Sequence, residues 1–397
     1  MTHGDKIIIT VLAVAIVVVA TALVVVNVQN EDTSDPIMDP VEVPVTDIPD
    51  DQSDQPKTNP ETDVPATDPK PVSLYPVGIT FDEENGILIS EDEIDWIYID
   101  ELKPYTKREE NPMSGTVLKL YPGLFTVKVS GETFNVIVDG IISDSYSWTY
   151  QYKGVKHDLS VDYDISIREL AESTLENRSW NSSTKHTFTE LPRIVYVNDT
   201  FYSIEKQMET LYVEIGGSLE DRQGFADFLA SFAQIAIKYP TRMGENNSTD
   251  YEIWGKDEYW ANSLETLYYG KGDCEDAAAV ACALFKSAGY DVAMVGVPGH
   301  VTAALSLDSF VECDIDDFRS YNNLYKSFTL ATGTSAVDDS DKLYYGVETI
   351  KGQVPVGYML KGSVTTLGKS TLYWGTAGFY PVYDLGNGAE SGIQLSL

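Results

Sequence analysis

The stretch that decides the fold runs from Leu264 to His300 and reads LETLYYGKGDCEDAAAVACALFKSAGYDVAMVGVPGH. The glycines before Asp273 predict a turn, and Asp273 suits the N-cap of a helix of small apolar residues that ends near Gly289. Cys274 would then be the first helical residue. The partial positive charge of a helix N-terminus favours a thiolate over a thiol, so this position is typical of a reactive cysteine.

A base is still needed, because Glu275 and Asp276 follow directly and their negative charges oppose a thiolate. The helix is followed by two strand-like runs, 291–297 and 300–307, joined by a Pro-Gly turn. His300 opens the second run. A helix N-terminus packed on a sheet can face the start of a strand, so we expect Cys274 and His300 to form a nucleophile–base pair.

A third group would fix the orientation and tautomer of the imidazole. The next strand-like run, LYYGVETI at 343–350, contains Glu348 among apolar and aromatic residues. An unpaired carboxylate there would be costly, and His300 is a partner that would explain it. A glutamate on an edge strand, facing water, is the alternative. Cys282, eight residues after Cys274, falls on the apolar stripe of the helix and is expected to be a small core residue.

Three segments, SLETLYYGKGDCEDAAAVACALFKSAGYDVAMV, GHV and YYGVETI, resemble the transglutaminase-like core found in archaeal and bacterial surface proteins. The resemblance spans 147–357, roughly half of the chain. It implies an α+β, papain-like core in which a helix carrying the nucleophile packs on an antiparallel sheet. It assigns the nucleophile to Cys274 and the histidine to His300. The third residue is usually Asp in this family, and here Glu348 takes its place.

The activity implied by this resemblance is acyl transfer by a thiolate, with a protein or peptide as the substrate. Hydrolysis of a peptide or amide bond, as by a cysteine peptidase, is favoured because water is the default acceptor. Three alternatives stay open: protein cross-linking by an amine acceptor, a catalytically inactive binding module, and a structural cell-surface protein.

The N-terminal segment indicates the compartment. Residues 7–26 form a run of twenty residues without charge, which as a helix is long enough to span a bilayer. Lys6 precedes it and acidic residues follow, which favours a cytoplasmic N-terminus and an extracellular body on a single-pass membrane anchor. A buried core helix is the alternative. Residues 31–76 are rich in Pro, Asp and Thr and predict a disordered linker.

The remaining organisation follows from strand and helix patterns. Short alternating runs over 77–140 predict a small β-sandwich-like domain. We place the catalytic domain at 141–360, with two strands around Gly154 and a helix over 219–238, and a C-terminal β extension at 361–397.

Composition limits the partners and cofactors. The chain has 62 acidic and 27 basic residues and a formal net charge of −35, which repels nucleic acid. Its three cysteines exclude a disulfide-stapled scaffold. No cofactor and no defined metal site is expected. The acidic insertion at 308–341 could bind Ca²⁺, but its spacing fits no known loop motif, and a solvated loop is the alternative.

Overall fold

The computed structural model describes residues 75–100, 102, 115–183, 186–297, 300–312, 330–331, 335–337, 342–350, 352–360 and 379–382. The predicted anchor at 1–30 and nearly all of the linker at 31–76 lie outside the described residues. Cys313 and most of the acidic insertion also lie outside them. Among the described residues, no helix combines the length and apolar character needed to cross a membrane.

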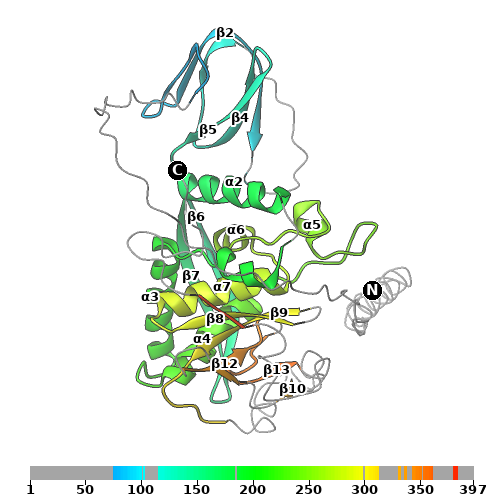
Figure 1. The fold of residues 1–397 in the computed structure, drawn as a ribbon. Coiled ribbons are helices and arrows are strands. Elements are labelled where there is room, and N and C mark those ends of the chain that lie inside the picture. Colours follow the sequence, from blue (N-terminus) through cyan, green and yellow to red (C-terminus); the bar gives the residue numbers. More distant parts are fainter. Residues whose placement is uncertain are drawn as a thin grey trace, which may run out of the picture. The chain divides into compact units, whose positions relative to one another are not determined.

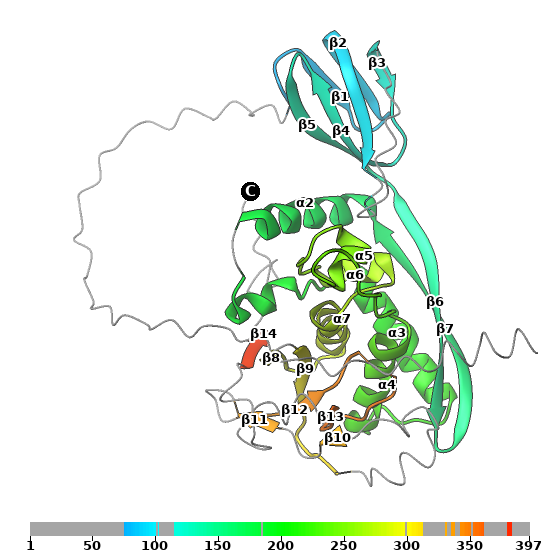
Figure 2. The same ribbon diagram turned by 90° about the vertical axis from the view of Figure 1, so that its right-hand side faces the viewer.

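The first strands form one curled antiparallel sheet, not the two packed sheets of the predicted sandwich (Figure 2). A shift of register within β2 lets its first half pair with β1 and β3 and its second half with β4. Alternate side chains gather into a separate apolar cluster that includes Leu88, Phe125 and Val136. The strands are β1 (Ile79–Asp82), β2 (Ile87–Asp100), β3 (Gly115–Lys119), β4 (Gly123–Val129) and β5 (Glu132–Val138).

A long hairpin follows, built from β6 (Ile141–Tyr152) and β7 (Val155–Ser166) around the predicted turn at Gly154. Every second residue of β7 from Leu159 is buried, as expected for a strand with one face on the core. The buried face of this hairpin packs against helices. On β6, Trp148 Nε1 donates a hydrogen bond of 3.1 Å to Ser231 Oγ.

Six α-helices and one 3₁₀-helix lie between this hairpin and the next strands. Asp221 caps α4 by accepting a hydrogen bond from the Gly224 N–H, so the helix is shorter than the predicted 219–238. The helices are α2 (Ile167–Ser183), η1 (Phe188–Ile194), α3 (Asp199–Glu214), α4 (Arg222–Ile235), α5 (Asp250–Trp254), α6 (Ser263–Tyr269) and α7 (Cys274–Ser287).

The central sheet is antiparallel throughout and has the strand order β11-β12-β9-β8-β14. Its edge strand β14 lies within the predicted C-terminal β extension at 361–397 and pairs with β8. The strands are β8 (Val292–Val297), β9 (His300–Ser306), β11 (Ser335–Val337), β12 (Leu343–Val347) and β14 (Phe379–Val382). Two further short strands, β10 (Leu330–Ala331) and β13 (Met359–Leu360), pair with each other.

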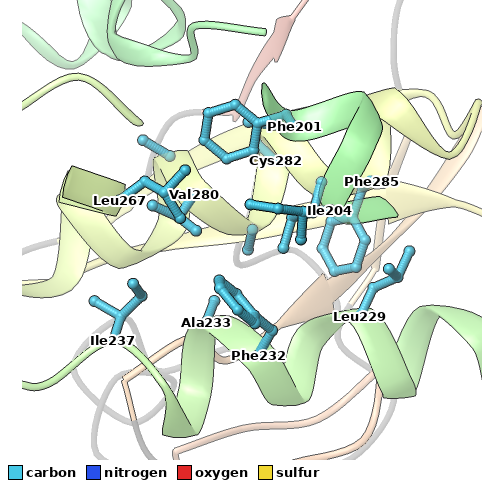
Figure 3. Packing of buried hydrophobic residues seen from close by; sticks show 14 of the residues in the cluster. Phe201, Ile204, Leu229, Phe232, Ala233, Ile237, Leu267, Val280, Cys282 and Phe285 are labelled. Atoms are coloured by element: carbon cyan, nitrogen blue, oxygen red, sulfur yellow. The ribbon is translucent and has the colours of Figure 1, made fainter. Parts of the chain in front are cut away.

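Helix α7 lies at the centre of the main apolar core. It packs on β8 and β9 and also contacts α3, α4 and α6 (Figure 1). Figure 3 shows Cys282 and Phe285 among side chains of α3 and α4. Cys282 is fully buried and its S–H donates to the Ala293 carbonyl, so the prediction of a core cysteine is confirmed. A helix on an antiparallel sheet also confirms the α+β class.

Candidate active site

A tight turn sets the start of α7. Gly270 ends α6 with a left-handed φ of 70°. Lys238 pairs with the two glycines of this turn. The Lys238 N–H donates to the Gly270 carbonyl, and the Gly272 N–H donates to the Lys238 carbonyl. A side chain at Gly272 would lie 2.4 Å from Asp276 Cβ, so only glycine fits. This packing places Cys274 at the first position of the helix, as the sequence predicted.

The Asp273 side chain occupies the N-cap position without capping the helix. Its Oδ2 instead accepts a hydrogen bond of 2.6 Å from Thr249 Oγ1. The first backbone N–H groups of an α-helix have no acceptor within the helix. The Asp273 side chain does not supply such an acceptor to the N–H groups at the start of α7.

The Cys274 thiol is partly buried and donates a hydrogen bond of 3.0 Å to Glu275 Oε2. Burial, followed by the charges of Glu275 and Asp273, raises the pKa of this thiol well above its usual value. A hydrogen bond from the Val301 N–H acts in the opposite direction. That contact places the sulfur at the beginning of β9, beside the residue that follows His300. Burial, together with the nearby carboxylates, thus outweighs the helix N-terminus, which we expected to favour the thiolate.

His300 is the first residue of β9 and is 9% exposed. Its Nε2 lies 3.1 Å from Glu348 Oε1 and 3.3 Å from Oε2. Burial lowers the pKa of His300, but the Glu348 charge and hydrogen bond, together with Asp273, outweigh it and raise the pKa above its usual value. An ionised carboxylate at Nε2 selects the tautomer with the proton on that atom, which makes Nδ1 the basic nitrogen.

Glu348 directly follows β12 and is completely buried, which excludes the alternative of an edge-strand glutamate facing water. The antiparallel register pairs Val347 with Ala303, so the chain that continues from β12 runs toward the start of β9, as the sequence predicted. The Thr349 N–H donates a hydrogen bond of 3.0 Å to Glu348 Oε1. The carboxylate is therefore held in place by both the imidazole and the backbone.

Helix α4 holds the segment that follows β12. Gln234 Nε2 donates to the Glu348 carbonyl at 2.7 Å and to the Val354 carbonyl at 2.9 Å, and its Oε1 accepts from the Val354 N–H at 3.1 Å. Asp227 Oδ1 accepts from the Val356 N–H at 2.7 Å. Gln234 was not among the predicted site residues. The available signal was an amide within the apolar stripe of a helix.

Acidic side chains gather beside the start of α7. Burial, then the Asp273 and Asp276 charges, raises the pKa of Asp250 to about 11. Burial followed by Asp273 likewise raises the pKa values of Glu275 and Asp276 well above their usual range. The sequence predicted Asp273, Glu275 and Asp276 at the start of this helix, but Asp250 and Glu258 were not predicted to lie beside them. The group comprises Asp250, Glu258, Asp273, Glu275 and Asp276.

No protein-family model matches this chain, and comparisons with curated proteins and with solved structures also give no match. The site is therefore interpreted from its own geometry.

Proposed function

We propose that this chain is a thiol-dependent acyl transferase of transglutaminase-like type that most readily hydrolyses peptide or amide bonds. Cys274 is the nucleophile, His300 is the base and Glu348 orients His300. The observation that carries the proposal is the 3.1 Å contact between His300 Nε2 and Glu348, at the strand end where the Val301 N–H reaches the Cys274 sulfur. The likeness of GDCEDAA, GHV and YYGVETI to the transglutaminase-like core supports the same assignment.

The first step needs the thiol proton to move to His300 Nδ1. This transfer requires the thiol to leave Glu275 Oε2 and to face the imidazole. Glu348 stabilises the resulting imidazolium through Nε2–H, as the carboxylate does in other triads. The raised pKa of His300 favours this proton transfer.

The thiolate then attacks the carbonyl carbon of the substrate, and an S–C bond forms while the carbonyl oxygen becomes an oxyanion. Backbone N–H groups at the start of α7 can donate to that oxyanion, because Asp273 leaves them uncapped. The C–N bond breaks as the leaving amine takes the proton from His300. A water molecule gives a proton to His300, attacks the thioester and releases the carboxylic acid and the thiol. An amine in place of water would give cross-linking.

Acyl-enzyme trapping tests this chemistry without knowledge of the substrate. The full chain is incubated with a peptide library and hydroxylamine, and mass spectrometry follows cleaved peptides and hydroxamates. We expect both products from the wild type and neither from Cys274→Ala or His300→Ala. Cys282→Ala and His157→Ala are matched controls that should keep the activity, since Cys282 lies in the core and His157 lies on the β6–β7 hairpin.

A binding or structural module on an inactive core is the second candidate function. The observation that favours it is the Cys274 thiol, which donates to Glu275 and has a raised pKa. Absence of hydrolysis products and hydroxamates with a folded wild-type chain would support this candidate and reject the first.

The location proposed for this activity is the outer face of a membrane, with residues 7–26 as a single-pass anchor. The apolar run and the acidic linker that follows it support this topology. Protease treatment of intact cells should release the body. A body protected inside the cell would show that the topology is wrong.

A further inference from the structure

Three aspartates beside the start of α7 have an unusual hydrogen-bonding pattern. Asp250, Asp273 and Asp276 are 1%, 7% and 0% exposed. In each carboxylate one oxygen accepts a hydrogen bond: from the Tyr259 N–H, the Thr249 hydroxyl and the Ala261 N–H, respectively. The other oxygens, Asp250 Oδ1, Asp273 Oδ1 and Asp276 Oδ2, have no hydrogen-bond partner among the described residues.

Burial of these three oxygens without a hydrogen-bond partner is expected to destabilise the folded protein. A buried polar atom without a partner destabilises the folded protein by about 1–3 kcal/mol, and more if it carries a charge. Nearly all buried polar groups in folded proteins are satisfied, so unpaired oxygens on three neighbouring carboxylates need an explanation, and a bound ligand would supply one. Since the second oxygen of each carboxylate is already engaged, the oxygens without a partner are the ones that a ligand would meet.

The spacing of the three carboxylates suits a metal ion. One oxygen from each of Asp250, Asp273 and Asp276 lies within 4.8 Å of the others. Oxygens that bind Ca²⁺ lie about 2.3–2.6 Å from the ion, so two of them across the ion are up to about 5 Å apart. Gly272 leaves room here, because a Cβ at that position would lie only 3.0 Å from Asp276 Oδ2.

The charged groups around the three carboxylates favour a cation as the ligand. Lys271, adjacent in sequence, is paired with Glu252 at 2.6 Å. The groups that act most strongly on the Asp250 carboxyl are Asp273 and Asp276, which are both acidic. Glu258 and Glu275 extend the same group and offer further oxygen ligands.

We propose that Asp250, Asp273 and Asp276 form a binding site for a divalent cation, with Ca²⁺ as the matching ion. The site joins α5 to the first turn of α7. A bound cation would satisfy the three oxygens and fix the start of the helix on the segment around Asp250. The site is separate from the acidic insertion at 308–341, where the sequence suggested a Ca²⁺ loop. The proposal does not rest on catalysis, since none of the three aspartates is assigned a chemical step.

Calorimetric titration of the full chain with CaCl₂ tests the site directly. The protein is first treated with a chelator and desalted, and the titration is run at about 150 mM NaCl to screen weak binding to the acidic surface. We expect one Ca²⁺ per chain with a Kd on the order of 10⁻⁶–10⁻⁴ M. A higher melting temperature with CaCl₂ than with chelator should accompany binding, because the ion binds only the folded state.

Variants distinguish Ca²⁺ binding at this site from nonspecific binding to the acidic surface and from any effect of the catalytic cysteine. Asp250→Asn and Asp276→Asn should each weaken Ca²⁺ binding at least tenfold. Asp158→Asn, at an exposed position on the hairpin, should bind as the wild type does, and so should Cys274→Ala. Melting curves in chelator check folding: the Asn variants should melt close to the wild type, since an amide oxygen can still accept the hydrogen bond from the Tyr259 or Ala261 N–H. Absence of saturable binding in folded wild type, or equal binding in Asp276→Asn, would overturn the proposal.

Discussion

The two ends of α7 differ in almost every physical respect. From Ala277 to Phe285 every side chain is buried and apolar, and this part packs on β9, α3 and α4. The first turn instead contains Cys274, Glu275 and Asp276, of which both acids are buried. Burial of apolar surface stabilises the helix, whereas buried carboxylates destabilise it unless they are paired. Stability therefore explains the later turns and leaves the first turn to be explained by function.

The two cysteines of α7 offer the strongest test of this contrast. Cys274→Ala should lower turnover about 10⁴-fold or more, because the attacking atom is lost. It should leave stability unchanged or higher. Cys282→Ala should keep turnover within about threefold and cost about 1 kcal/mol, since it removes a buried sulfur from the core. Turnover of a peptide from the library and urea denaturation measure the two effects. An equal loss of turnover in folded Cys282→Ala would break the comparison.

Glu348→Gln should have the next largest effect, a loss of about 10²–10⁴-fold in kcat. An amide cannot stabilise the imidazolium, and its NH₂ group can favour the wrong tautomer of His300. Removal of the Glu348 charge also lowers the pKa of His300, so the limb of the pH–rate profile that reports this group should shift to lower pH. Glu214→Gln, at an exposed position, is the control. Unchanged activity in folded Glu348→Gln would remove Glu348 from the site.

The parts of the site that the sequence predicted depend on local patterns. An N-cap followed by a run of small residues marks the start of α7, and strand periodicity marks β9 and β12. Two strands beside each other in an antiparallel sheet then bring Glu348 to His300. Gln234 reaches Glu348 only through the packing of α4, and no local pattern reports such a contact.

The same limit explains the error in the predicted β domain and the unpredicted pairing of β14. Alternating residues identify strands but leave their pairing undetermined. The register shift in β2 allows one strand to pair with three neighbours, which replaces the predicted sandwich by a single sheet. The four residues of β14 belong to the central sheet through pairing with β8, a contact that their own sequence does not encode.

Gln234→Met should lower kcat about tenfold while the chain stays folded. The substitution leaves the carbonyls of Glu348 and Val354 without a donor, so the segment after β12 should become less well positioned. A positioning role predicts a change in the pH–rate profile similar in direction to that of Glu348→Gln, but smaller. Gln207→Met is the matched control, because Gln207 makes comparable hydrogen bonds to the Asp162 backbone on β7. Equal kcat and pH profile in wild type and Gln234→Met would show that α4 does not position the site.

The smallest expected effect is on the pH dependence of stability. It tests whether buried acids outside the first turn of α7 contribute to that dependence. Burial raises the pKa of Glu205 to about 7, and Glu205 lies on α3 within 3.2 Å of Lys206 Nζ. Burial also raises the pKa of Asp227 to about 7. Both values exceed those of the unfolded chain, so the folded state holds these protons more tightly. The resulting stability is fully present below about pH 4 and is lost as the pH rises through about 7.

We therefore expect the melting temperature of the full chain in chelator to fall between pH 5 and pH 8. Glu205→Gln should make that fall smaller, by the equivalent of about 1 kcal/mol in the free energy of unfolding, because an amide does not ionise. Glu214→Gln, exposed at the end of the same helix, should leave the fall as it is in the wild type. If Glu205→Gln follows the wild-type curve over this range, the buried acids outside the first turn of α7 do not govern the pH dependence. The buried acids in the first turn of α7 would then differ in this respect from the buried acids in the rest of the fold.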